Sequence, residues 1–143
     1  MRAVRKGGPF HVCYNHKSIF TRKIYTNMKK FIVMYLAPSS VLKEWMQTPE
    51  AERKAQEEKM QSEWKTWMRE HADMFDGMTA GVGATKLVTA DAVTDSHNDI
   101  MLYSIVKGES QDEVAQAFVG HPHFGIPKAT IQVCAINPLP GME

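Results

Sequence analysis

Long apolar runs predict the strands of this chain. KKFIVMYL at 29–36 and DIMLYSIVK at 99–107 carry β-branched and aromatic residues with scarcely a polar break, which is typical of strands. Two weaker runs, ATKLVTA at 84–90 and ATIQVCAI at 129–136, are also predicted to be strands. Between them, glycines at 77, 81 and 83 predict a loop, and the polar residues 91–99 predict a turn.

Apolar spacings of three and four residues predict a long helix after the first strand, and a short helix precedes it. Ser39 or Ser40 offers a hydroxyl N-cap to the short helix. Thr48-Pro49-Glu50 supplies the long helix with a cap, a proline at its first position and an acid in its first turn. We expect this helix to reach about Ala72. Its apolar stripe consists of Met60, Trp64, Trp67, Met68 and His71.

A third helix is predicted between the last two strands. Ser110-Gln111-Asp112-Glu113 is a capping box, and Gly120 is placed to end the helix in a left-handed conformation. From Met28 the main elements therefore follow the order β–α–β–β–α–β. With right-handed crossovers, this order predicts a ferredoxin-like α+β fold, with the helices on one face of a four-stranded antiparallel sheet.

The second face of the predicted sheet is apolar too. In the first strand Phe31, Val33 and Tyr35 share one face, and the residues between them, Ile32, Met34 and Leu36, share the other. A face open to water should instead carry polar residues. No segment remains to cover it, so we expect a homodimer in which two copies pack sheet against sheet about a two-fold axis.

Charge divides the chain near Met28. Residues 1–27 hold six basic residues and no acid, whereas the rest holds 11 basic and 16 acidic residues. We interpret residues 1–27 as a basic N-terminal extension, either disordered or upstream of the true start, and residues 28–143 as one α+β domain. A targeting peptide is an alternative. Nucleic-acid binding has little support, because the charges are scattered and form no basic helix.

Composition is that of an ordinary globular chain, with 43% hydrophobic and 23% charged residues. No apolar run approaches the roughly 20 residues of a membrane span, so we expect no membrane partner. Cys13 and Cys134 match neither a metal-binding spacing nor a disulfide framework, which favours a reducing, cytoplasmic location.

Candidate chemistry gathers in GHPHFG, after the third helix. Pro122 favours an extended His121, and the predicted topology brings His121 and His123 to the same end of the sheet as Asp99. One hypothesis is acid–base catalysis, with either histidine as the base and Asp99 orienting it. A second is a divalent-metal site to which Asp99 or His97 adds ligands. The third is structural, a helix-to-strand turn in which a histidine pairs with the last helical carbonyls.

Three further residues are candidates for ligand binding. Asn98 lies beside Asp99, and Tyr103 and Tyr35 could present hydroxyl groups to a pocket between helices and sheet. The structural alternatives are that Asn98 shapes its turn and that the tyrosines pack in the core. No pattern predicts a cofactor.

The second half of the chain, from Asn98-Asp99 through Tyr103-Ser104 and His121-Pro122-His123 to the tail PLPGM at 138–142, resembles the YCII-related proteins. The resemblance covers about Met28 to Glu143. It implies a dimeric α+β barrel fold but no settled activity. The histidine–aspartate pair of that family does not transfer to this chain, because Ser39, Ser40 and Lys43 occupy the start of the first helix, where the family has its histidine.

The sequence therefore leaves three functions open. The first is a homodimeric small-molecule-binding protein or acid–base enzyme, such as an isomerase, hydrolase or lyase, with a pocket between helices and sheet. The second is a metal-dependent enzyme that uses His121 and His123. The third is a regulatory or structural dimer without catalysis.

Overall fold

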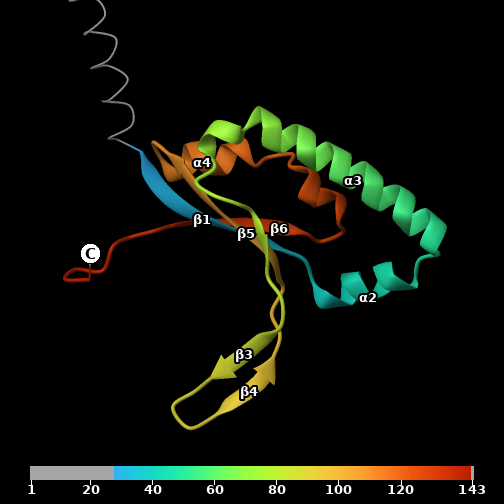
Figure 1. Ribbon diagram of the computed structural model, residues 1–143, viewed down its shortest axis with the longest axis horizontal. Helices are drawn as coiled ribbons and strands as arrows, with labels where there is room; N and C mark the ends of the chain where they lie inside the picture. The colour runs from blue at the N-terminus through green and yellow to red at the C-terminus, as the bar shows by residue number, and fades with distance from the viewer. Residues whose placement is uncertain (1–27, 143) are drawn as a thin grey trace, which may run out of the picture.

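The protein has an α+β fold built on a four-stranded antiparallel sheet with the order β2-β5-β1-β6 (Figure 1). The computed structural model describes residues 28–142, so the expectations about residues 1–27 lie outside it. The strands are β1 (Lys29–Leu36), β2 (Ala80–Gly81), β3 (Thr85–Val88), β4 (Val93–Ser96), β5 (Ile100–Gly108) and β6 (Thr130–Ala135). The helices are α2 (Ser39–Gln47), α3 (Glu50–Glu70) and α4 (Gln111–Ala117), with short 3-10 helices η1 (Ala72–Met74) and η2 (Pro122–Gly125).

Strand β1 is the centre of the sheet. It pairs with β5 on one side and with β6 on the other, so that Val33 lies opposite Ser104 in β5 and Val133 in β6. Alternate side chains of β1 are fully buried, namely those of Phe31, Val33 and Tyr35. The predicted segments 29–36, 99–107 and 129–136 are thus confirmed as neighbouring strands.

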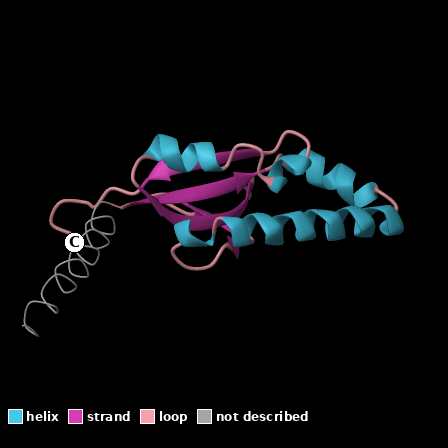
Figure 2. Cartoon of the chain, turned by 90° about the horizontal axis from the view of Figure 1, so that it is seen from above, coloured by secondary structure: helices cyan, strands magenta, loops and turns pink. Residues whose placement is uncertain are grey.

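Helices α3 and α4 lie on the same side of the sheet (Figures 1 and 2). Trp67 of α3 and Val114 of α4 pack with Phe118 against the buried face of β1 and Val106 of β5, and this cluster is the hydrophobic core. The predicted stripe of α3 is confirmed, because Trp67 is buried and Met60, Trp64, Met68 and His71 are partly buried. None of the described helices is long and apolar enough to cross a membrane.

The first half of α3 extends past the end of the sheet and runs beside α2 (Figure 2). Of residues 50–59 only Arg53 is partly buried, whereas the second half of the helix covers the core. α2 directs Val41, Leu42 and Trp45 inward and leaves Lys43, Glu44 and Met46 exposed. The two helices therefore form a V-shaped extension at one end of the sheet.

The prediction that the strand at 84–90 belongs to the four-stranded sheet is wrong. Residues 85–88 form β3, which pairs with β4 in a separate hairpin that projects from the body (Figure 1). The sheet edge is instead the very short β2, inside the expected glycine loop. A tight turn at 89–92, in which Thr89 N–H donates to the Ala92 carbonyl, brings the hairpin strands together. β4 was missed because it carries mostly polar residues and is exposed on both faces.

Two of the predicted helix caps are wrong and one is confirmed. Pro38 and Pro49 occupy the N-cap positions of α2 and α3, and neither helix has a side-chain cap. The Ser39 and Ser40 hydroxyls are therefore within the first turn of α2. At α4 the Glu113 N–H donates to Ser110 Oγ over 3.1 Å, as the capping box predicts.

Close packing at the end of β5 gives a test of the core. A Cβ atom on Gly108 would overlap Val114 Cγ2, and Val114 is a β-branched, buried helical residue with little rotamer freedom. We expect Gly108→Ala to lower the free energy of unfolding by about 1–3 kcal/mol. Gly83→Ala, where the added methyl meets nothing within 4 Å, should stay within about 0.5 kcal/mol of wild type. Urea denaturation measures both, and equal effects would contradict this packing.

Candidate functional site

His121 begins the turn that joins α4 to β6. Gly120 takes the left-handed conformation predicted for it, with φ +76°, and His121 is extended, with φ −58° and ψ 144°. The His121 side chain caps η2, because its Nδ1 accepts the backbone N–H of His123 over 2.9 Å. The expected pairing of a histidine with the carbonyls of the preceding helix is therefore replaced by an N-cap of the following one.

His123 ties this turn to the central strand. Its Nε2 donates to the carbonyl of Leu36, the last residue of β1, over 2.9 Å. The two imidazoles are 1% and 0% exposed. These bonds place the proton of each neutral ring on Nε2. Within residues 28–142, His121 Nε2 and His123 Nδ1 then have no hydrogen-bond partner.

Aromatic rings surround the His121 imidazole, whose Nε2 has no hydrogen-bond acceptor among the described residues. The ring centroids of Trp64 and Trp67 lie 4.5 Å and 4.3 Å from that of the imidazole, at interplanar angles of 85° and 65°. Tyr35 and Phe118 complete the enclosure at 5.5 Å and 5.7 Å. An N–H that faces an aromatic ring gains only a weak interaction, so this site strongly favours a neutral imidazole.

Burial, together with the smaller effects of the nearby His123 and His71, lowers the pKa of His121 to about 4. Burial also lowers the pKa of His123, although the backbones of Leu36 and Thr130 oppose this effect. His71 lies near His121, since its ring stacks on Trp67 with centroids 4.0 Å apart. Burial therefore favours the uncharged form of both histidines at neutral pH.

Asp99 does not join the histidines in a catalytic arrangement. Its side chain is exposed, and its backbone carbonyl accepts the N–H of Ala37 over 3.0 Å. No hydrogen bond or ion pair within the described part of the chain links the Asp99 carboxylate to His121 or His123. Asp99 instead lines a shallow hollow with Ser39, His97 and Asn98, so part of the predicted cluster does gather. No three His, Cys, Asp or Glu residues within 28–142 are placed to share a metal ion.

The three candidate ligand-binding residues lie in different places. Asn98 shapes its turn, since its Oδ1 accepts the Ile100 N–H over 2.9 Å and its Nδ2 donates to Thr85. Tyr35 is in the core, where its hydroxyl bonds Ser104 Oγ over 3.1 Å, and burial raises its pKa. Tyr103 is 38% exposed and lies opposite Met34, on the other face of the sheet.

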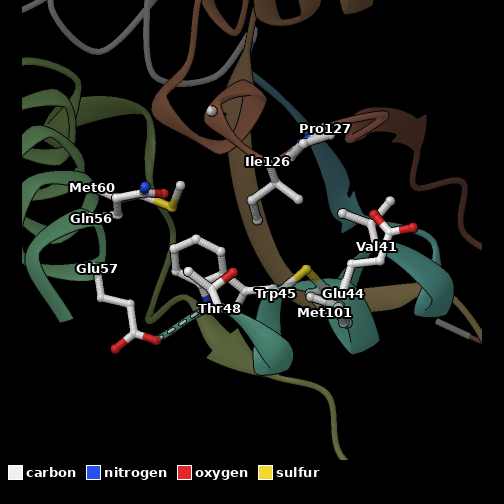
Figure 3. Close-up of a pocket in the computed structure, with 12 residues that line it drawn as sticks. Val41, Glu44, Trp45, Thr48, Gln56, Glu57, Met60, Met101, Ile126 and Pro127 are labelled. Carbon is white, nitrogen blue, oxygen red and sulfur yellow. Dashed lines mark hydrogen bonds between the residues drawn. The ribbon is translucent and has the colours of Figure 1, made fainter. Parts of the chain in front are cut away.

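Sequence reasoning expected a pocket between helices and sheet but did not identify the residues of the cavity that lies within the V-shaped extension. It has a volume of about 450 Å³ and lies between α2, the first half of α3, β5 and residues 125–127. Figure 3 shows side chains of Trp45, Met60 and Ile126 around this space. We call it the α2–α3 pocket. Its lining is Val41, Leu42, Glu44, Trp45, Thr48, Gln56, Glu57, Met60, Met101, Gly125, Ile126 and Pro127. Apolar pockets of this size with a few polar groups are typical of small-molecule sites.

One polar contact crosses the α2–α3 pocket. Trp45 Nε1 donates to Glu57 Oε1 over 3.3 Å and so joins the two helices (Figure 3). Arg53 Nε approaches the same carboxylate oxygen at 3.8 Å. An adjoining groove shares Glu57, Met60, Met101 and Ile126 with the pocket and continues to Thr79 and His123. The sequence signals for the α2–α3 pocket were the apolar spacing in 41–45 and the position of Met60.

Comparison with protein-family models finds no match, and comparison with curated proteins finds no significant similarity. The resemblance to the YCII-related proteins therefore stays a prediction.

The lowered pKa of His121 predicts that the fold loses stability in acid. Below pH 6.5 the unfolded chain binds a proton at His121 that the folded chain does not bind until about pH 4. The stabilisation is thus complete above pH 6.5 and is lost as the pH falls toward 4, by up to about 3 kcal/mol. His121→Asn keeps an N-cap acceptor and should reduce this loss, whereas His97→Asn, at an exposed position, should not. Urea denaturation at pH 7 and pH 4.5 measures the difference.

A direct titration tests the same point without a variant. In the wild-type protein, NMR should follow the His121 ring to an apparent pKa near 4. An ordinary value near 6.5 would contradict the buried, neutral imidazole.

Proposed function

We propose that this protein is a homodimeric small-molecule-binding protein with a ferredoxin-like, dimeric α+β barrel fold, and that its ligand occupies the α2–α3 pocket. The pocket is the observation that carries the proposal. It combines an apolar wall from four segments with a few polar side chains, namely Glu44, Thr48, Gln56 and Glu57. Such a lining buries the body of a ligand and fixes its orientation through a small number of polar contacts.

Binding is favoured over catalysis because the histidines are committed to structure. His121 Nδ1 and His123 Nε2 already hold the turn before β6 in place. A general base should have a pKa near the working pH, and that of His121 is about 4. No carboxylate orients either ring within the described residues.

An acid–base enzyme is the second candidate. It is favoured by the groove beside the α2–α3 pocket, which has the buried His123 in its wall, and by His123 Nδ1, which has no partner among the described residues. NMR titration separates the two candidates. A His123 pKa near neutrality that shifts when a ligand binds would support acid–base chemistry, whereas a ring that stays neutral from pH 5 to 8 would support binding alone.

The apolar second face of the sheet supports the dimer. Helices α3 and α4 pack on the first face, and the second face presents Ile32 and Met34 of β1 beside Ile105 and Tyr103 of β5. These side chains are partly buried or exposed within one chain. A second copy placed sheet against sheet would remove them from water.

Solution mass tests the dimer. The wild-type protein should have twice the mass of one chain at micromolar concentration by light scattering. Ile105→Lys, which places a charge in the centre of the second face, should yield monomers with unchanged helical circular dichroism. Val119→Lys, at an apolar position that is 70% exposed on α4's side of the molecule, should remain dimeric. A wild-type monomer would contradict the proposal.

A fluorescent probe tests the α2–α3 pocket. Nile red, a neutral polarity-sensitive dye, should bind with saturation at about one dye per chain. Ile126→Trp should weaken this binding at least about tenfold, because the larger side chain fills the cavity. Phe124→Trp is the matched control, since Phe124 lies two residues away and does not line the pocket. Equal binding by both variants would place the dye elsewhere.

A further inference from the structure

The charged side chains that line the α2–α3 pocket are all acidic. Glu44 and Glu57 are the charged residues of its lining, and no lysine or arginine among the described residues contributes to it. Arg53 approaches Glu57 Oε1 at 3.8 Å and also donates to the Met46 carbonyl over 3.3 Å. Within residues 28–142 the hydrogen bond made by the Glu57 carboxylate is at Oε1, and its second oxygen makes none. The pocket therefore offers a free acceptor to a positively charged group.

Trp45 adds a second feature that favours a cation. Its Nε1–H is bonded to Glu57 Oε1, which fixes the indole at the wall of the pocket (Figure 3). A cation beside Glu57 that also reaches the face of this indole gains a cation–π interaction. Met60 and Met101 add polarizable sulfur atoms to the same wall.

An anionic ligand is disfavoured for the same reasons. A carboxylate or phosphate in this cavity would lose its hydration, approach two carboxylates and find no cationic partner in the lining. A neutral apolar ligand would bury its surface in the pocket but would offer no partner to the second Glu57 oxygen, which would stay hydrated. A ligand with an apolar body and one ammonium group satisfies both parts of the pocket.

We propose that the α2–α3 pocket binds a primary amine with an apolar or aromatic body, in its cationic form. The body lies among Met60, Met101 and Ile126, and the ammonium group lies at Glu57 beside the indole of Trp45. This inference rests on the proposed function and names the chemical class of the ligand for the same site.

A matched set of ligands tests the charge. Isothermal titration calorimetry at pH 7 and low salt compares 4-phenylbutylamine, 4-phenylbutan-1-ol and 5-phenylpentanoate, which share one apolar body. The amine should bind about five- to tenfold more tightly than the alcohol, and the acid should bind most weakly. The advantage of the amine should shrink in 0.5 M salt, because partly exposed charges are screened.

Charge-removing variants locate the effect. Glu57→Gln should reduce the ratio of amine to alcohol affinity by about fivefold and leave alcohol binding within about twofold. Glu63→Gln makes the same charge change further along α3, outside the pocket lining, and should leave both affinities unchanged. An equal effect of the two variants would overturn the assignment to Glu57.

The outcomes separate this inference from the proposed function. If Nile red binds in the pocket but the alcohol or the acid binds as tightly as the amine, the inference of a cationic ligand is wrong and the binding function stands. If neither the dye nor any of the three ligands binds, the proposed function fails, and the inference fails with it.

Discussion

The hydrogen bond from His123 to the Leu36 carbonyl organises one end of this molecule. It joins the turn after α4 to the end of the central strand, immediately before α2 begins. The same turn continues into residues 125–127, which form one wall of the α2–α3 pocket. Helix α3 packs closely against this turn, since a Cβ atom added to Gly125 would lie only 3.2 Å from Met60 Cε. The position of the pocket wall thus depends on a buried imidazole.

This dependence explains why two histidines are buried in a largely apolar interior. A buried polar group is costly unless its bonds are made. Each ring makes one hydrogen bond, and its other nitrogen has no partner among the described residues. Trp64, Trp67 and Phe118 accommodate the unpaired side of His121. The histidines therefore specify the conformation of the connection that contains the short helix η2, and the proposed ligand site lies beside them.

Local sequence signals predicted the central part of the fold well. β1 and β5 are apolar on both faces, the α3 stripe is regular, and Ser110 caps its helix through residues close in sequence. The edge strand β2 could not be predicted, because two residues carry no periodicity and its pairing with β5 is set by the tertiary structure. The site was harder still. Tyr35 and Tyr103 look alike in sequence, but the alternation of strand residues sends them to opposite faces, and the α2–α3 pocket combines segments far apart in the chain.

The β3–β4 hairpin packs little against the rest of the described chain. All its residues but Thr85 are exposed, including Leu87, Val88 and Val93 at 51%, 70% and 64%. A two-stranded ribbon without a packed face is only marginally stable in water. Its amide protons should therefore exchange with solvent through a local opening of low free energy. Those of β1 should exchange only when the whole domain unfolds. A single chain thus contains two units whose amide protons differ greatly in protection from exchange. The two strands of the hairpin at 85–96 can come apart without disturbing the core.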